Sequence, residues 1–576
     1  MRRAAWLLLG VAIAACGSDE PAAESSSPCV AFAKPEASSP KLASLSTAAP
    51  SGATRVFAVG AKTFAISPAG ITVLGEAMPV IAKSAVDAVA VGADLFVASR
   101  VGTSVVVDQY DASFGPKKQA IHTVANVDTV SLAADGDDLL VAAGTEVLRG
   151  AAAQFAPKVV ATGLQRPLLE ADPVTRKIWI VDRRSDGDRL HRLADGRDYT
   201  KSEPAITLSG NDRPRLANGN VVFAAGDKAR GLAGALVYAT ATGLAAIDLF
   251  GPSGPPTVRV FDGVQGTVLG RDASGDLVLA DGKTLEDDSD ATLPRLLSQT
   301  KCFDLAAKNG AVAGAVPYEV DVALWSDGAS KERFAVVPGG KKIVVEADGD
   351  FSFPVGTVLV KTFSFDGKRV ETRLLVQHGI EDWAGYTYAW QADGKDAELV
   401  AGRRAVPVAK GTWTIPSRTD CNACHTPAAK YALGPELRQL SRSHDAFEPF
   451  LVKDTNPSSP LAPLDGAATA EQKARSYLHA NCSGCHRDGS STGLAELDLR
   501  IDVPLGKTGL CGDPKTVDLG VTGAKILAAG DPTKSTIALR MRATDDSRMP
   551  KLGSRVVDDA AVKVVEEWIK GLPACN

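Results

Sequence analysis

The stretch Lys177-Ile-Trp-Ile-Val-Asp182 shows the pattern that decides the fold of the N-terminal half: a short apolar run bounded by charged residues, typical of a β-strand. Five similar runs surround it: Arg55-Val-Phe-Ala-Val-Gly60, Asp94-Leu-Phe-Val-Ala98, Asp138-Leu-Leu-Val-Ala142, Asn220-Val-Val-Phe-Ala224 and Asp276-Leu-Val-Leu-Ala-Asp281. They recur every ~40 to 55 residues, near the length of a four-stranded blade. We therefore expect an all-β, β-propeller-like domain of about six blades over 51–296. A pair of β-sandwiches or an irregular β-fold is the alternative.

A second β-rich domain is expected to follow at 297–410. The runs 357–363 and 370–378 alternate apolar and polar residues with a period of two, as half-buried strands do. Tyr386, Tyr388 and Trp390 then share one face of a strand. Such an aromatic stripe more often belongs to a plain core than to the cover of a cofactor.

The first sixteen residues are typical of an export signal. Arg2 and Arg3 precede a short apolar run that ends in Ile13-Ala-Ala-Cys16. This ending looks like the lipobox of bacterial lipoproteins, which implies a signal peptide at 1–16 and lipidation of Cys16. Residues 17–50, rich in Ser, Ala and Pro, would be a disordered tether. We expect an exported protein, lipid-anchored on the periplasmic or cell-surface face of a bacterial membrane; a plain secretory signal is the alternative.

Two segments carry the chemistry: Cys421-Asn-Ala-Cys424-His425, within 411–466, and Cys482-Ser-Gly-Cys485-His486, within 467–576. Each matches the attachment motif of c-type haem. Two thiols three positions apart can bond to both vinyl groups of one porphyrin, and the adjacent histidine can ligate its iron. The sequence thus predicts two covalently bound haem c groups. A redox disulfide in each pair, or one zinc ion held by both pairs, is the alternative.

Four further cysteines remain once Cys16 and the motif thiols are assigned, an even number in an oxidising compartment. Three pairings are possible. We favour Cys511 with Cys575, which flank the C-terminal haem region, and Cys29 with Cys302, which would tie the tether to a domain junction.

Residues 467–576 have the layout of a mainly α, class I cytochrome c-like domain. Residues 470–480 form an expected helix that runs into Cys482, and 556–572 form an expected closing helix. Between them lies Met549, the natural sixth ligand of the second haem, because a thioether opposite imidazole suits iron. Met541 sits on an expected helix and is assigned to packing.

The distal ligand of the first haem is harder to assign, since no second methionine is at hand. His378 ends a strand beside the aromatic stripe and is our first candidate as a metal ligand; His444 is the second. An open or otherwise ligated iron stays possible.

From about 296 to 572 the chain resembles a poorly characterised bacterial family of diheme c-type cytochromes. The matching stretches are Pro317-Tyr318, Leu324-Trp-Ser-Asp-Gly-Ala-Ser-Lys331, 353–363, 370–373, 383–390, 396–399, 412–418, Leu497-Asp-Leu-Arg500 and Gly530-Asp-Pro532. The resemblance implies diheme electron transfer. Some proteins with this module look associated with quinoprotein sugar dehydrogenases, whose propeller holds pyrroloquinoline quinone (PQQ) beside a catalytic histidine.

The leading functional hypothesis is an electron carrier that works with a redox partner protein or a quinone-linked dehydrogenase, with no catalytic residue of its own. The net charge of −5 offers no broad basic surface for nucleic acid. The alternatives are a PQQ-type dehydrogenase, a diheme peroxidase and a sensing module. For the first of these, His122 and His191 are the only histidines of the N-terminal β-region, and neither lies in a sequence typical of a quinone site.

Overall fold

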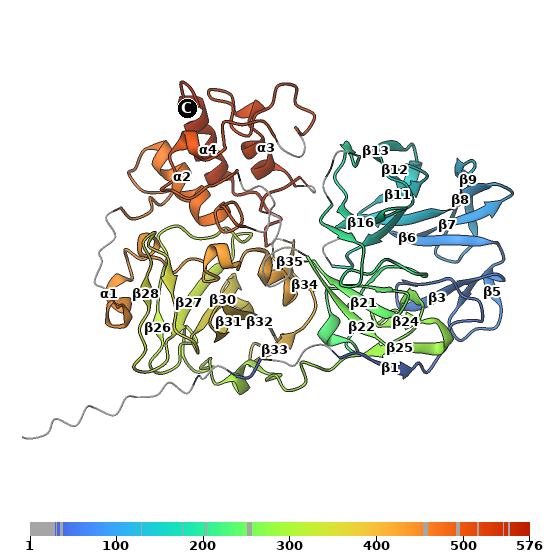
Figure 1. Cartoon of the computed structure of the whole chain (residues 1–576), viewed down its shortest axis with the longest axis horizontal. Coiled ribbons are helices and arrows are strands. Elements are labelled where there is room, and N and C mark those ends of the chain that lie inside the picture. The colour runs from blue at the N-terminus through green and yellow to red at the C-terminus, as the bar shows by residue number, and fades with distance from the viewer. Residues whose placement is uncertain are drawn as a thin grey trace, which may run out of the picture.

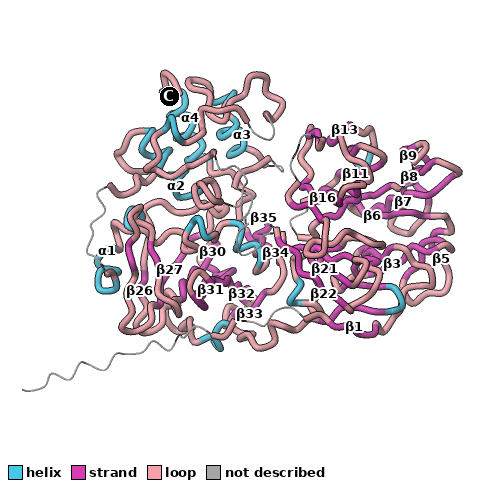
Figure 2. Tube along the Cα trace, in the orientation of Figure 1, coloured by secondary structure: helices cyan, strands magenta, loops and turns pink. Residues whose placement is uncertain are grey.

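The computed structural model describes residues 29, 32–34 and 39–575, except 128, 175–176, 201, 203, 250–255, 410, 453–458, 491–495, 515–517, 545–546 and 551–552. In Figure 1 a β-propeller lies on one side, and a twisted sheet with a C-terminal part that carries the helices lies on the other. Figure 2 shows that strands and loops dominate throughout.

The N-terminal half is a six-bladed propeller, which confirms the predicted architecture. The first blade consists of β2 (Arg55–Val59), β3 (Lys62–Ser67), β4 (Gly70–Val73) and β5 (Pro79–Ile81). The second consists of β6 (Ala85–Val91), β7 (Asp94–Val101), β8 (Ser104–Tyr110) and β9 (Pro116–Val124). The third consists of β10 (Val130–Asp135), β11 (Asp138–Ala143), β12 (Glu146–Ala151) and β13 (Lys158–Thr162), and the short strand β17 (Arg197–Asp198) pairs with its outer edge. The fourth is β14 (Pro167–Ala171), β15 (Ile178–Arg184), β16 (Gly187–Arg192) and β18 (Ile206–Leu208), and the fifth is β19 (Val222–Phe223), β20 (Leu236–Ala239), β21 (Gly243–Asp248) and β22 (Thr257–Asp262).

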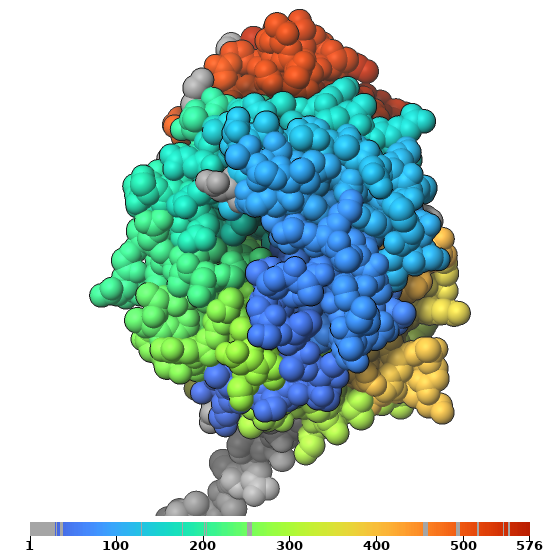
Figure 3. All heavy atoms as spheres, turned by 90° about the vertical axis from the view of Figure 1, so that its right-hand side faces the viewer, coloured from blue at the N-terminus to red at the C-terminus, as the bar shows by residue number. Residues whose placement is uncertain are grey.

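The sixth blade closes the ring with a strand from the other end of the domain. Its strands are β23 (Val268–Arg271), β24 (Leu277–Leu279), β25 (Lys283–Glu286) and β1 (Lys41–Ser44). Strand β1 pairs antiparallel with β25 as the outermost strand, and the inner strands β2 of the first blade and β23 of the last blade meet in parallel at Val56 and Gly270. Figure 3 shows the ring from outside, with the colours following one another around it.

A six-stranded antiparallel sheet follows the propeller. Its order is β26 (Val316–Pro317), β27 (Ser330–Val336), β30 (Val358–Phe365), β31 (Lys368–Gly379), β32 (Asp382–Trp390) and β33 (Ala397–Val400). Two hairpins accompany it, β28 (Val344–Val345) with β29 (Phe351–Ser352), and β34 (Arg404–Val408) with β35 (Gly411–Ile415).

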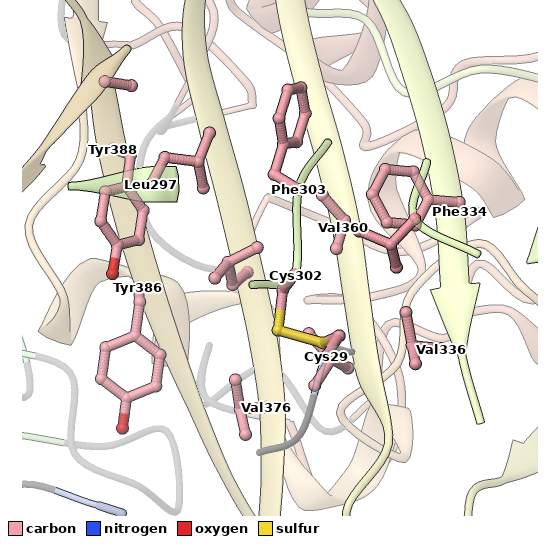
Figure 4. Packing of buried hydrophobic residues seen from close by; sticks show 14 of the residues in the cluster. Cys29, Leu297, Cys302, Phe303, Phe334, Val336, Val360, Val376, Tyr386 and Tyr388 are labelled. Carbon is pink, nitrogen blue, oxygen red and sulfur yellow. A yellow bond between two sulfur atoms is a disulfide. The ribbon is translucent and has the colours of Figure 1, made fainter. Parts of the chain in front are cut away.

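One face of this sheet packs on an apolar core that includes Tyr386, Tyr388 and the disulfide between Cys29 and Cys302 (Figure 4). Trp390 packs against the same cluster. The aromatic stripe is therefore plain core. The opposite face of the sheet is left for the motif segments.

The prediction of a mainly α C-terminal domain is wrong. The described helices are short: α1 (His444–Phe447), α2 (Ala470–Cys482), α3 (Thr536–Arg542) and α4 (Asp559–Gly571). The two longer helices, α2 and α4, lie close to where the sequence places them, but the described residues between α2 and α3 form turns and two short 3₁₀ helices, Leu505–Lys507 and Pro532–Lys534. Gly509 has a φ of +77°, and a Cβ there would lie 2.0 Å from the Glu496 carbonyl oxygen. Such left-handed glycines end a helix rather than extend it.

The C-terminal part still has its own core. Residues from α2, α3 and α4 pack together, among them Leu478, Met541 and Trp568. A disulfide between Cys511 and Cys575 closes this part, so the structure forms both disulfides that the sequence favours.

Candidate haem-attachment site

The first motif begins in a 3₁₀ turn, Thr419–Ala423, that a buried carboxylate organises. Asp420 accepts hydrogen bonds from the backbone N–H and the hydroxyl of Ser417 at 2.9 and 2.8 Å. Its other partner is Arg403, whose Nε donates to Oδ2 at 2.7 Å. Arg403 lowers the pKa of Asp420 against the opposing effect of burial. The turn that presents Cys421 is thus held by charge-assisted hydrogen bonds.

Cys421 lies directly against the free face of the sheet. A Cβ atom on Gly385 of β32 would stand 2.6 Å from the Cys421 Sγ. Only glycine leaves room there, so strand and thiol form a close contact. Because side chains alternate along a strand, this contact is on the face opposite to Tyr386.

His425 has the geometry of a ligand held in a fixed tautomer. Its Nδ1 donates to the carbonyl oxygen of Tyr431, which leaves Nε2 with a lone pair. Burial lowers the pKa of His425 to about 4, and the charges of Lys361 and Arg373 act in the same direction. The imidazole is therefore neutral at neutral pH, as iron ligation requires.

The second motif is delivered by the C-terminal end of α2. The helix starts with a capping box of Thr469 and Gln472 and ends at Cys482. Just before the motif, Asn481 accepts a hydrogen bond from the Trp325 backbone N–H at 2.6 Å. Trp325 lies in the stretch 324–331, and this stretch therefore helps to hold the end of α2 that presents the second motif.

His486 carries an unsatisfied nitrogen. Burial lowers its pKa to about 4, and among the described residues its buried Nδ1 has no hydrogen-bond partner. Leaving a buried polar atom unpaired costs about 1–3 kcal/mol. An unpaired buried nitrogen on the histidine of the motif suits a site that is completed by a bound group.

The two motifs meet. The Sγ atoms of Cys424 and Cys485 are 3.3 Å apart, and the four motif thiols are unpaired, whereas the other four described cysteines form disulfides. Burial raises the pKa of Cys421 to about 11 and that of Cys482 to about 12. The hydrogen bond with Cys485 lowers the pKa of Cys424, and redox-active Cys-x-x-Cys pairs also have a lowered thiol pKa, so the thiol pKa values do not separate a haem-attachment motif from a redox pair. No group of three or more His, Cys, Asp or Glu side chains in the described part of the chain could hold a metal ion.

Met549 lies in a loop that one arginine organises. The Arg548 guanidinium donates to the carbonyl oxygens of Met541, Ala543, Ser554 and Val556 and to the Ser554 hydroxyl, at 2.9 Å for the first two. Met549 is half-buried, and its N–H donates to the Arg540 carbonyl at 3.0 Å. The positive charge of Arg540 also lowers the pKa of His486. Met541 is 6% exposed and packs in the core, as predicted.

The structure does not bring His378 to the first motif. Its Nε2 lies 2.8 Å from the Tyr386 hydroxyl, beside the apolar core and on the face away from Cys421. His444 begins α1 next to Asp445. His479, near the second motif, is engaged at both nitrogens by Glu436 and the Ile501 N–H.

Sequence reasoning missed four supporting residues: Gly385, Arg403, Tyr431 and Arg548. Arg548 stands directly before the candidate ligand, and this proximity was a usable signal. Gly385 and Arg403 are far from the motif segments they contact, so only the fold reveals them.

The predicted anchor at Cys16 lies outside the described residues. Within the described part, no helix has the length and apolar character needed to cross a membrane.

No protein-family model matches the sequence, and no curated protein sequence matches it. Several solved structures show a distant likeness. The PQQ-bound aldose sugar dehydrogenase of Streptomyces coelicolor is 13% identical at a TM-score of 0.32, over 44% of this chain and 99% of that one. A Thermus thermophilus oxidoreductase assigned as a glucose dehydrogenase is 14% identical at 0.31, over 43% and 99%. The WD40 domain of Neurospora crassa Pan2 is 12% identical at 0.26, over 41% and 88%. These values support no statement on activity.

Proposed function

We propose that this chain is a diheme c-type electron-transfer protein, in which Cys421, Cys424 and His425 hold one haem and Cys482, Cys485 and His486 hold the other. Each haem, when bound, supplies a one-electron iron couple. The observation that carries the proposal is the convergence of the motifs: two Cys-x-x-Cys-His segments, 61 residues apart, meet with Sγ atoms 3.3 Å apart.

The chain's own residues suit this role. Burial of the half-buried His425 and His486 side chains lowers their pKa values, so both are neutral at neutral pH. Met549 lies on a loop near Arg540, whose charge also lowers the pKa of His486. Closely spaced carriers allow electrons to pass between them, while the propeller offers a docking surface for a redox partner protein or a quinone-linked dehydrogenase. The proposal places the protein outside the cytoplasm, anchored through Cys16.

Covalent haem content tests the proposal directly. The purified protein should keep two haems per chain after acid-acetone extraction, and the variant with Cys482→Ala and Cys485→Ala should keep one. As a matched control, Cys511→Ser with Cys575→Ser removes two cysteines from the same part of the chain and should keep both haems. Haem released into the organic layer would refute the proposal.

A PQQ-type dehydrogenase is the second candidate, favoured by the propeller itself. The two histidines available to it lie away from the ring axis: His122 on the outermost strand β9, and buried His191 on the third strand β16. A catalytic base would have to be another residue. Reduction of the bound haems by an aldose only after PQQ is added would favour this candidate over a simple carrier.

A further inference from the structure

The free face of the six-stranded sheet carries a row of positive charges. Arg333 on β27 is directly opposite Lys361 on β30, and Lys361 is directly opposite Arg373 on β31. All three side chains therefore project from the same face. Lys331, two residues before Arg333, is on this face as well.

Like charges in directly opposed positions repel one another and destabilise a sheet. Only Arg373 has a carboxylate partner, Glu371, whose Oε2 lies 3.1 Å from its Nη2 and also accepts from Trp413 at 2.7 Å. Among the described residues, neither the Arg333 guanidinium nor the Lys361 ammonium makes a hydrogen bond or ion pair. Glu319 acts on Arg333, and Asp327 and Asp558 act on Lys331, through space only. Among the described residues, three of the four cations therefore have no carboxylate bonded to them.

Burial makes these positive charges still more costly. It lowers the pKa of Lys361 well below the usual value, with the charges of Arg333 and Lys331 acting in the same direction. Yet the row is not sealed, because the Arg373 side chain is 26% exposed. A ligand can therefore reach these groups, and an anion would offset their charges.

The row lies beside the first motif. Gly385, on which Cys421 sits, is on the next strand, opposite Leu375, two residues along β31 from Arg373. The positive charges of Lys361 and Arg373 also lower the pKa of His425. A group held by Cys421 and His425 would thus lie over the same face of the sheet as the row.

We propose that Arg333, Lys361 and Arg373 bind the two propionate carboxylates of the haem carried by Cys421 and Cys424, an inference that rests on the proposed function. Guanidinium groups suit carboxylates because their N–H groups can bond both oxygens, and the ammonium supplies a third positive charge. A free oxyanion such as inorganic phosphate has the same chemistry, and the experiment separates the two sources.

The test is a spectroelectrochemical titration of the holoprotein with Lys361→Met. A propionate bound beside Lys361 would hold it in the ammonium form, so Lys361→Met removes a positive charge beside the haem. This loss favours the more positive ferric form, so at a fixed potential the ferrous-to-ferric ratio of one haem should fall about tenfold, equivalent to ~59 mV. Lys368→Met is the matched control, because Lys368 is an exposed lysine of the same β30–β31 hairpin. It should leave both potentials unchanged, and Lys361→Arg should restore the wild-type value.

Arg333→Gln, at an independent position of the row, should give the same shift and keeps the test decisive if Lys361→Met does not fold. Equal potentials for the Lys361 and Lys368 variants would overturn the inference while two covalent haems remain. A potential that responds to inorganic phosphate, but not to chloride at equal ionic strength, and only when Lys361 is present, would assign the row to a free anion and also overturn it. Absence of covalent haem from the wild type would instead refute the proposed function.

Discussion

His191 in the propeller shows how one buried side chain links the fold to pH. It is 2% exposed on β16, packs edge-on against Tyr199 with ring centroids 4.8 Å apart, and has a buried Nε2 without a hydrogen-bond partner among the described residues. Burial lowers its pKa to about 4. The ring is therefore neutral in the folded protein over most of the pH range.

This predicts acid sensitivity of the propeller. In the unfolded chain His191 takes up a proton below about pH 6.5, whereas in the folded protein it does so only near pH 4, so the free energy of unfolding falls as pH decreases through this window. The loss at pH 5 is about 2 kcal/mol. His191→Phe keeps a ring and cannot titrate, so its urea midpoint should fall less than that of the wild type between about pH 7.5 and pH 5.

His122→Phe is the control, because His122 is half-buried on an outer strand and burial lowers its pKa less far. An equal fall of the urea midpoint in wild type and His191→Phe would contradict the assignment.

The sequence could place His425 and His486 because each directly follows a cysteine pair. It could not place His378, since the face a residue takes depends on register, and the pairing of β31 with β32 shifts between Gln377 and Gly379. A shift of one residue moves a side chain to the other face of a sheet.

At the scale of elements, the loop between α3 and α4 depends on the Arg548 guanidinium, which satisfies the carbonyl oxygens at the end of α3 and those of the chain leading to α4. This arrangement separates the two methionines. Met541 faces the core from α3, and Met549 stays on the loop.

Replacing these methionines should have unequal effects. If Met549 ligates the second haem, Met549→His should abolish the weak sulfur-to-iron band of the ferric protein and lower one of two midpoint potentials, because a thioether stabilises ferrous iron more than nitrogen does. Met541→Leu should leave both unchanged and alter the free energy of unfolding by less than about 1.5 kcal/mol. Loss of the band in Met541→Leu alone would reverse the two roles.

Helices α2 and α4 could be predicted because their apolar residues recur with helical spacing and face one core. The turns between α2 and α3 could not. Their conformation comes from glycines such as Gly509 and from long-range contacts, which local periodicity does not encode.

At the scale of the whole molecule, Arg403 joins parts that are distant in sequence. It pairs with Asp172 of the propeller and with Asp420 beside the first motif, and its side chain is only 6% exposed. The six blades could be predicted from the spacing of apolar runs, but not this junction, since a buried ion pair leaves no periodic trace. The two halves of the chain are thus linked at the residue before Cys421.

The predicted lipid anchor at Cys16 also concerns the whole molecule. If Cys16 carries lipid, the haem absorbance should remain with the membrane fraction of cells that produce the wild type, because two or more acyl chains hold a protein firmly on a bilayer. Cys16→Ala should move that absorbance to the aqueous fraction or block processing. Unchanged membrane association would exclude lipidation of Cys16 as the anchor.

The closing pair of β1 with β25 also sets an order of events during folding. Residues 41–44 precede 283–286 by about 240 residues, so β1 cannot pair with its partner strand until nearly the whole propeller sequence is present. Until then the last blade lacks its outermost strand, and the ring of blades stays open. Ring closure thus requires nearly all of the propeller but none of residues 297–576, which include both Cys-x-x-Cys-His motifs, so the propeller can close independently of the segment that follows it.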